Sequence, residues 1–331
     1  MRESLCFFGT YHCASHGPRR KRRQDMAAPS TPPLVSIVTP TYNQAEFLAA
    51  TLDSMLAQDY PNIEYIVLDD GSTDGTPEVL NRYTGRVRWE RQANIGQSRT
   101  LNKAWAQARG KYLGYLSSDD LLLPHAISTL VKALEAHAEA VVAYCDFDLI
   151  DSTGKRSGFT PSPDYDHRRM VEELICPPGP GALFRRSLFE QIGGWNEQLR
   201  KIPDFEYWLR AGRVGSFLRI PEVLAQYRVH AESTAIRPIP AERTMEIVDT
   251  ARAYWGGDNG ASARASFASA HLKAAKSHAQ SGRPLAALGQ FARSIRYRPK
   301  NLVSVSAWGK LMSGLALRFT SRFERLSAML R

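Results

Sequence analysis

The sequence has little cysteine and no long apolar stretch. Its 331 residues include four cysteines, at positions 6, 13, 145 and 176, with neither a C-x-x-C pair nor the Cys/His spacing of a zinc site. A chain of this size with so few cysteines does not depend on a disulfide framework. No stretch reaches the roughly 18 apolar residues of a membrane-spanning helix, and the first residues lack the apolar segment and cleavage site of a signal peptide. We therefore expect a reducing, cytoplasmic location.

The sequence also lacks the two common glycine patterns that bind phosphate. Neither G-x-G-x-x-G nor G-x-x-x-x-G-K-[ST] occurs at a turn after a predicted strand. These absences argue against dinucleotide-binding proteins and P-loop NTPases.

Negative charge is scarce at both ends of the chain. Residues 34–260 carry 24 Lys/Arg against 30 Asp/Glu, whereas residues 1–33 carry six against two and residues 261–331 carry 13 against one. The net charge of +10 therefore resides in the terminal segments, and the mildly acidic central part does not suit nucleic acid. We expect residues 1–33, with the run Arg19–Arg23, to be a disordered basic tail or an overextended start before Met26. A nuclear signal or an RNA-binding arm is the alternative for this run.

Strand and helix patterns alternate over residues 34–144. Short apolar runs predict strands, and apolar residues spaced by three or four predict helices. Thr76 is expected to cap the second helix, which Pro77 begins. The predicted strands are 34–39, 63–68, 87–89, 112–116 and 141–144, and the predicted helices are 44–58, a segment from 77, 98–108 and 124–137. This alternation is typical of an α/β fold with a doubly wound, mainly parallel sheet.

Two of the predicted strands end in adjacent carboxylates. The fourth strand leads to Asp119 and Asp120, and the second leads to Asp69 and Asp70. A single Asp-Asp pair is more often a helix cap or a turn, but two pairs at one sheet edge predict a shared site. Because α/β sheets bind ligands at the carboxyl ends of their strands, we expect a divalent cation and a phosphorylated ligand there.

A set of short motifs gives the sequence a family resemblance. The motifs are Val35–Asn43 (VSIVTPTYN), Leu68–Asp74 (LDDGSTD), Asn94–Gly96 (NIG), Ser118–Asp120 (SDD), Gly181–Arg186 (GALFRR), Gly193–Asn196 (GGWN), Asp204–Arg210 (DFEYWLR) and Tyr227–His230 (YRVH). In this order and spacing, the sequence resembles the inverting family 2 glycosyltransferases of the GT-A fold over about residues 34–235.

The resemblance implies a site for a nucleoside-diphosphate sugar of the UDP, dTDP or GDP type. Pro40 and Tyr42 would wall the base, with Tyr42 offering its ring face. Asp70 would accept a hydrogen bond from the base N–H, with a capped turn as its alternative role. Asn43 and Ser72 are expected among the nucleotide-binding residues.

The resemblance also implies a divalent cation, Mn²⁺ or Mg²⁺. Asp120 would coordinate a cation that bridges the diphosphate and offsets the charge on the departing nucleoside diphosphate. Asp119 would hydrogen-bond the ribose or join the metal shell. His230 would complete that shell, with a structural role as the alternative.

Inversion requires a base on the face of the sugar opposite the diphosphate, and the resemblance points to Asp204. Related sequences often have Glu-Asp before an aromatic residue, whereas Pro203 stands here in place of the first acid. If Asp204 instead caps the next helix, Glu206 would be the substitute base. Trp195 and Arg186 are expected to line the acceptor cleft, a core position being the alternative for Trp195.

Beyond residue 240 the sequence becomes alanine-rich and helical. Patterns at 262–279 and 285–298, separated by a Ser-Gly-Arg-Pro turn, predict a tetratricopeptide-like helical hairpin. Residues 304–331 predict a basic amphipathic helix, and its apolar stripe comprises Val305, Trp308, Met312, Leu315, Phe319, Phe323, Leu326 and Leu330. This helix would lie on an anionic membrane surface or pack against protein, and we favour the membrane.

The expected organisation is therefore a tail over 1–33, a GT-A domain over 34–240, a helical hairpin extension over 241–303 and an amphipathic helix over 304–331. The expected function is metal-dependent, inverting transfer of a sugar to a hydroxyl of a saccharide or lipid-linked acceptor, in polysaccharide or glycolipid assembly. The enzyme would be cytoplasmic and peripheral on the inner face of the membrane, with no nucleic acid partner. A nucleotidyltransferase and a catalytically silent nucleotide-sugar-binding module are the alternatives. A nucleotidyltransferase would usually carry a glycine-rich basic loop where this chain has Pro40–Asn43.

Overall fold

The computed structural model describes residues 31–233 and 239–314. The described residues from Pro33 onward belong to one compact unit. The expected basic tail falls mainly on residues 1–30, and much of the expected amphipathic helix falls on residues 315–331. Both segments lie outside the described residues. Within the described part, no helix has the length and apolar character needed to cross a membrane.

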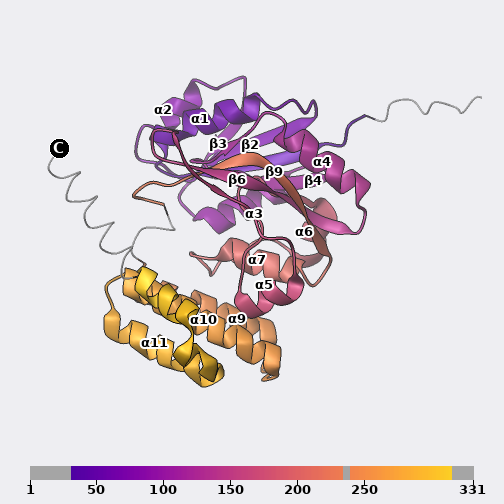
Figure 1. Cartoon of the computed structure of the whole chain (residues 1–331). Helices are drawn as coiled ribbons and strands as arrows, with labels where there is room; N and C mark the ends of the chain where they lie inside the picture. Colours follow the sequence, from indigo (N-terminus) through magenta and orange to yellow (C-terminus); the bar gives the residue numbers. More distant parts are fainter. Residues whose placement is uncertain (1–30, 234–238, 315–331) are drawn as a thin grey trace, which may run out of the picture. The chain divides into compact units, whose positions relative to one another are not determined.

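The strand and helix alternation expected from residue 34 onward is present up to β4 (Figure 1). The elements are β1 Val35–Thr41, α1 Ala45–Leu56, β2 Ile63–Asp69, α2 Thr76–Asn81, β3 Arg88–Arg91, α3 Gln97–Gln107 and β4 Tyr112–Tyr115. The expected Thr76 cap is wrong, because Thr76 is the first residue of α2 and Gly75 precedes it as the N-cap. The Thr76 hydroxyl instead accepts a hydrogen bond from the Gln44 backbone N–H at 3.0 Å, and so ties α2 to the start of α1.

The next part of the chain adds further strands and the helices around them. They are β5 Leu121–Leu122, α4 Ala126–Ala136, β6 Ala140–Ile150, β7 Arg156–Thr160, α5 His167–Glu173, β8 Leu183–Arg185, α6 Arg186–Ile192, α7 Pro203–Ala211 and β9 Ser216–Arg228.

All of these strands belong to one mixed sheet with the order β3-β2-β1-β4-β8-β6-β9-β5, and β7 pairs with β6. The strands β3, β2, β1 and β4 are parallel, so their carboxyl ends meet at one edge. Strand β8 runs antiparallel between β4 and β6, and β9 runs parallel to β6. The end of β9 pairs with β5, which places residues 225–228 beside the segment that follows Asp120.

Helices cover both faces of the sheet, as an α/β fold requires (Figure 1). Side chains alternate along β1, so Val35 and Ile37 pack in the cluster of α4, whereas Val38 packs in the cluster of α3. Trp105 of helix α3 lies in the same cluster as Val38, and its ring stacks on Tyr207 of α7 with the ring centroids 6.1 Å apart. This packing fixes α7 against the lower face of the sheet.

The chain then forms a helical part. Its elements are α8 Ala241–Thr244, α9 Glu246–Trp255, α10 Ala261–Gln280, α11 Pro284–Tyr297 and the 3-10 helix η1 Pro299–Val303. Helices α10 and α11 are the two helices of the expected hairpin. Alanines dominate the buried face of α10, and their small side chains let neighbouring helices approach closely. The Ser262 hydroxyl donates to the Glu172 carboxylate at 2.7 Å and so joins α10 to α5.

Residues 305–314 form one more helix, and its buried face differs from the expected apolar stripe. Ala307 and Leu311 pack into a cluster with α10 and α11, whereas Val305, Trp308 and Met312 are exposed. The described part of the expected amphipathic helix therefore packs through small and medium side chains, and it leaves the expected stripe facing outward.

Candidate active site

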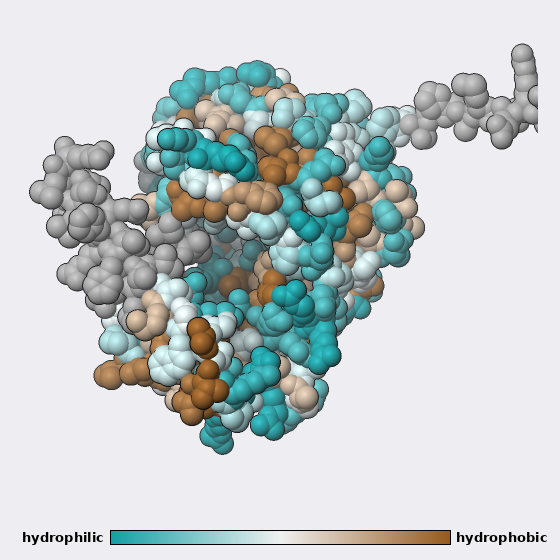
Figure 2. Space-filling view, in the orientation of Figure 1, coloured by the Kyte–Doolittle hydropathy of each residue, from teal (hydrophilic) through white to brown (hydrophobic). Residues whose placement is uncertain are grey.

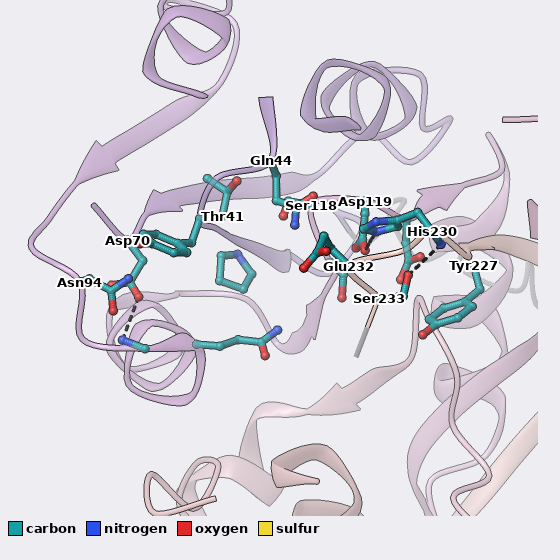
Figure 3. A pocket seen from close by; sticks show the side chains of 16 residues that line it. Thr41, Gln44, Asp70, Asn94, Ser118, Asp119, Tyr227, His230, Glu232 and Ser233 are labelled. Carbon is teal, nitrogen blue, oxygen red and sulfur yellow. Dashed lines mark hydrogen bonds and ion pairs between the residues drawn. The ribbon is translucent and has the colours of Figure 1, made fainter. Parts of the chain in front are cut away.

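A cavity of about 400 Å³ opens at the carboxyl ends of β1, β2 and β4 (Figure 3). We call it the first cavity. Its lining combines residues that follow the three strands with residues just beyond β9: Pro40, Thr41, Tyr42, Gln44, Asp70, Asn94, Gly96, Gln97, Ser117, Ser118, Asp119, Asp120, Tyr227, His230, Glu232 and Ser233. The two expected acidic strand ends thus meet at one site, because the parallel pairing of β1 with β2 and β4 brings them to the same edge.

One end of the first cavity is built around Asp70 (Figure 3). The Asp70 carboxylate is buried and accepts hydrogen bonds from the backbone N–H groups of Ile95 and Gly96 at 2.9 and 2.8 Å. It also accepts from the Gln92 side chain at 2.9 Å, so it fixes the loop between β3 and α3. The Tyr42 side chain, 46% exposed, leaves its ring free to cover a planar ligand at this end.

Asn43 and Ser72, both expected among the nucleotide-binding residues, do not line the first cavity but lie in the loops behind it. The Ser72 hydroxyl accepts from the Asn43 backbone N–H at 2.9 Å, and the Asn43 side-chain oxygen accepts from the Thr73 N–H at 2.8 Å. Asn43 has φ +53°, a left-handed conformation that asparagine tolerates better than most residues. The pair therefore joins the loops after β1 and β2 and holds Tyr42 and Asp70 in place.

The other end of the first cavity contains Asp119 and His230, which point toward each other in Figure 3. The His230 Nε2 atom lies 3.1 Å from an Asp119 carboxylate oxygen. The His230 ring also packs on the Phe47 ring with centroids 4.6 Å apart. The chain brings His230 here by pairing β9 with β5, so a residue 111 positions away contacts the acidic motif.

Asp120 is almost completely buried beside Asp119. One of its carboxylate oxygens accepts from the Arg228 backbone N–H at 2.9 Å, and the Arg228 guanidinium donates to the Asp119 carbonyl at 2.8 Å. Burial raises the pKa of Asp120 well above its usual range, and the neighbouring Asp119 charge raises it further. A positive charge in the cavity would relieve both effects.

The residues at this end fit a hard divalent cation. Among the described residues, no group of three or more His, Cys, Asp and Glu side chains is arranged as a metal site. Mg²⁺ and similar ions are commonly held by one or two carboxylates together with substrate phosphates. Asp120 and Asp119 supply the carboxylate oxygens that such a site needs, and the open cavity beside them leaves room for a diphosphate.

A second cavity of about 480 Å³ adjoins the first. The two cavities share Gln97, Ser117, Asp120 and Tyr227. The second is also lined by Asp204 and Trp195, together with the loop around Pro178 and Gly179. The site is therefore a pair of connected compartments with Asp120 at their boundary.

Asp204 lies in the first turn of α7 and lines the second cavity. Helix α7 begins at Pro203, and Ile202 is its N-cap, so the alternative that Asp204 caps this helix is wrong. Proline is well suited to the first helical position because it needs no N–H partner there. Burial raises the pKa of Asp204, although backbone hydrogen bonds at the helix start oppose that effect. A carboxylate of raised pKa is a stronger proton acceptor than an ordinary aspartate.

Glu206 does not line the first or second cavity. Both of its carboxylate oxygens accept from the Arg210 guanidinium, at 2.7 and 2.9 Å. Arg210 also donates to the Ile192 and Gly194 carbonyls and so fastens α7 to the loop after α6. This position away from both cavities favours Asp204 over Glu206 as the expected base.

The two expected acceptor residues lie in different places. Trp195 lines the second cavity, and its mostly buried ring packs edge-on against Tyr115 with centroids 5.0 Å apart. Arg186 lies at the opposite end of β4, where its guanidinium donates to the Ala108 and Gly110 carbonyls. The expected acceptor role of Arg186 is wrong, because the antiparallel pairing of β8 with β4 carries this residue to the amino end of β4.

Sequence reasoning missed several lining residues. Gln97 follows the Asn94–Gly96 motif directly, and Glu232 follows His230, so their neighbours could have indicated them. Arg200 and Lys201 line the second cavity but carry no local signal.

Arg200 reaches across to the start of α3 because residue 96 is a glycine. Gly96 has φ +88°, and a Cβ added there would overlap the Arg200 guanidinium. Glycine at this position therefore meets two needs at once, a left-handed backbone and space for the arginine.

Comparison with known proteins shows the family and the fold of this chain. Residues 36–193 match the family model described as glycosyl transferase family 2. The chain is 31% identical over 233 residues to an uncharacterized glycosyltransferase of Rickettsia typhi, covering 68% of this chain and 71% of that protein. It is 28% identical over 230 residues to chondroitin synthase of Escherichia coli. That match covers 68% of this chain but only 33% of the synthase.

Two solved structures are similar in fold. One is S. aureus TarS residues 1–349 in complex with UDP-GlcNAc, with a TM-score of 0.60, 17% identity, and coverage of 88% of this chain and 92% of that chain. The other is the mannosyltransferase PcManGT from Pyrobaculum calidifontis in complex with GDP-Man and Mn²⁺, with a TM-score of 0.55, 20% identity, and coverage of 91% and 85%. These likenesses confirm the expected α/β fold of the GT-A type with a helical C-terminal part.

Proposed function

Because this chain belongs to glycosyl transferase family 2 and is a glycosyltransferase, we propose that it inverts the anomeric carbon of a sugar that it moves from a nucleoside diphosphate to a hydroxyl acceptor, with the help of a divalent cation. The proposed donor is a UDP, dTDP or GDP sugar. TarS and PcManGT were solved with UDP-GlcNAc and with GDP-Man and Mn²⁺, which supports a nucleotide-sugar donor and a cation.

The observation that carries this proposal is the boundary between the first and second cavities. Asp120 lines both cavities, whereas Asp204 lines only the second of them. Tyr227 also lies at the boundary, and burial raises its pKa, as do the charges of Asp120, Asp119 and Asp204. A sugar held at this boundary would have its diphosphate on the Asp120 side and its opposite face toward Asp204.

In the first cavity, the chain would bind the donor through fixed groups. Tyr42 and Pro40 cover the base, and Asp70 holds the loop of Asn94 and Gly96 that closes the same end. Asp70 already accepts three hydrogen bonds, so we propose that it positions this loop as well as contacting the base. Asp120 and Asp119 would hold the cation, which when bound neutralises charge on the leaving diphosphate. His230 would orient Asp119 through their 3.1 Å contact.

In the second cavity, Asp204 would act as the general base. The acceptor hydroxyl oxygen attacks the anomeric carbon as the bond to the diphosphate oxygen breaks, and the hydroxyl proton passes to the Asp204 carboxylate. The bond forms on the face opposite the one that breaks, so the configuration at the anomeric carbon inverts. The nucleoside diphosphate leaves with the electron pair of the broken bond.

We further propose that the acceptor is a saccharide or a lipid-linked glycan and that the enzyme works at an anionic membrane surface. Large apolar side chains are exposed on α11, η1 and the helix at 305–314: Leu285, Leu288, Leu302, Val303, Val305, Trp308 and Met312. Figure 2 shows brown residues gathered at the lower left, where Figure 1 places α11. Residues 261–314 carry nine Lys/Arg and no Asp/Glu. Exposed apolar residues flanked by cations are typical of protein surfaces that bind at the interface between an anionic membrane and water.

Product analysis tests the central proposal and separates it from nucleotidyl transfer. The purified chain should be incubated with Mn²⁺ and a panel of UDP, dTDP and GDP sugars, and the released nucleotide should be identified. A glycosyltransferase releases a nucleoside diphosphate with at least one donor, whereas a nucleotidyltransferase consumes or releases pyrophosphate. Absence of nucleoside diphosphate release with every donor, with and without saccharide acceptors, would contradict the proposal.

A further inference from the structure

A third cavity of about 320 Å³ adjoins the second one on the side away from the donor. The two cavities share Cys176, Lys201 and Asp204. The remaining walls of the third cavity include Arg243 and Thr244 at α8, Ile247 of α9, and Lys273 and Ser277 of α10. The helical part of the chain therefore reaches the proposed base Asp204 from behind.

The lining of the third cavity has more cations than acids. Its lining contains Lys201, Arg243 and Lys273, and Asp204 is the one acid among the lining residues. Apolar side chains such as Leu174 and Phe205 form much of the remaining wall. Apolar walls limit the access of water and so strengthen the attraction of cations for an anion inside the cavity.

The cations on the α8 side are held in place by a buried carboxylate. Glu246 is almost fully buried and accepts from the Arg200 and Lys201 backbone N–H groups, the latter at 2.8 Å. It also pairs with the Arg243 guanidinium at 3.1 Å. One carboxylate thus orders the loop before α7 and the arginine of α8, so the basic wall is built and not incidental.

Lys273 extends from α10 into the cavity without a carboxylate partner. No ion pair within 4.0 Å links its ammonium to an Asp or Glu in the described part of the chain. Lys273 is exposed to solvent where it lines the cavity, so its charge is available to a ligand that enters. A cation in such a position is stabilised by an anion that enters from outside.

We propose that the third cavity binds an anionic group, a phosphate or a carboxylate, that the acceptor carries next to the hydroxyl that receives the sugar. This inference rests on the proposed function, because it places the acceptor hydroxyl at Asp204. The anionic group lies between Lys273 and Arg243, where lysine acts as a point charge and arginine donates two parallel hydrogen bonds. The helical extension therefore selects charged acceptors over neutral ones.

The test compares three alkyl glycosides of the same sugar that differ in one group. The first is neutral, the second is the uronoside, which carries a carboxylate, and the third carries a phosphate. The measured quantity is the ratio of kcat/KM for each anionic acceptor to that for the neutral one. We expect a ratio of about ten or more for the wild-type chain with at least one anionic acceptor, since each tenfold corresponds to about 1.4 kcal/mol. The carboxylate and phosphate arms show which anion is preferred.

Substitutions in α10 locate the preference. Lys273→Met keeps the length of the stem and removes the charge, so the ratio should fall to about one. Lys273→Arg should keep most of the preference. Lys276→Met is the matched control, because it removes one charge from the same helix at a position outside the lining of the third cavity.

A wild-type ratio near one, or a ratio that Lys273→Met leaves unchanged, would overturn the inference. A binding measurement gives a readout that does not need turnover. Inorganic phosphate should bind the full chain saturated with nucleoside diphosphate and Mn²⁺ when followed by calorimetry, and Lys273→Met should lose this binding while Lys276→Met keeps it. Equal binding by the three proteins would also overturn the inference. Failure of the proposed function is distinguishable, because then no nucleoside diphosphate is released with any donor.

Discussion

The proposed donor side and the proposed acceptor side of the site are built in opposite ways. The donor side comes largely from loops in the first 120 residues, and backbone N–H groups that donate to the side chains of Asp70, Asn43 and Ser72 hold those loops together. The acceptor side combines residues 176–204 with α8 and α10 of the C-terminal part. The donor side is acidic, whereas residues 261–314 have no acid at all.

This difference indicates a division of labour. A nucleotide and a cation have a fixed chemistry, and a rigid acidic edge of a parallel sheet suits them. The acceptor side faces helices whose cations and exposed apolar residues can be changed without disturbing the donor loops.

The largest effect is expected from the donor side. Asp120→Ala should lower turnover at least about a thousandfold, because loss of the cation removes several kcal/mol of stabilisation from the leaving diphosphate. Steady-state assays across a Mn²⁺ titration measure this effect. Excess EDTA should inhibit the wild-type chain to a similar level, and full activity of the variant or in EDTA would show that Asp120 has no metal role.

Asp204 tests the acceptor side. Asp204→Asn should lower kcat by about 10² to 10⁴ while donor affinity stays near that of the wild type, because a positioned base acts in the transition state. Glu206→Gln is the matched control, since Glu206 lies in the same helix turn but pairs with Arg210 away from the first and second cavities. Loss of donor binding in Asp204→Asn with an unchanged kcat would contradict the assignment.

The same carboxylate predicts a pH dependence. Burial raises the pKa of Asp204, so this base stays protonated and inactive up to a higher pH than an ordinary aspartate of about 3.9. The rate should therefore rise with pH through the raised pKa, and Asp204→Asn should lose this acidic limb. A pH–kcat profile of the two proteins measures it. An identical limb in both would assign the titration to another group.

Gly96 tests the junction between the two sides. Gly96→Ala should displace the Arg200 guanidinium and raise KM more than Gly85→Ala does, because the added Cβ would overlap the guanidinium at a backbone position with φ +88°. Gly85→Ala is a matched control, since Gly85 has φ +85° and nothing within 4 Å of an added Cβ. Both variants share a backbone strain of roughly 1–2 kcal/mol. Equal KM values for the two would mean that Arg200 does not influence the site.

The smallest effect is expected at the proposed membrane surface. The triple substitution Val305→Ser, Trp308→Ser and Met312→Ser should lower binding to phosphatidylglycerol vesicles severalfold, because these exposed side chains would enter the interface. Flotation at low and high salt measures both contributions, since salt screens the attraction of the cations. Phe159→Ser on β7 is the control for loss of an exposed apolar side chain elsewhere. If the intact chain fails to float under every condition, the surface serves another purpose.

The sequence predicted the parts of the molecule that depend on local patterns. The alternation up to β4, the acidic ends of β2 and β4, and the α10–α11 hairpin follow from apolar spacing and turn residues. The meeting of Asp70 with Asp120 at one edge follows from parallel pairing. Asp204, expected as the base from the family resemblance, lines the second cavity, and its capping alternative is wrong because Pro203 starts the helix one residue earlier.

The sequence did not predict the features that depend on long-range pairing. Arg186 was placed at the acceptor side, but strand β8 runs antiparallel to β4 and carries it to the far end. Asn43 and Ser72 were expected at the ligand, but they use their polar atoms on each other's loops. Arg200, Lys201 and Lys273 reach the cavities from a loop and a helix whose positions no local pattern reveals.

The central claim is that the donor and the base lie on opposite sides of the sugar, with Asp120 and Asp204 marking those sides. The most direct measurement is proton NMR of the first product formed from an α-linked nucleoside-diphosphate sugar. The coupling constant of the anomeric proton should report a β-linked product for a sugar of gluco or galacto configuration. An α-linked first product would show retention and would contradict the placement of Asp204 as the base.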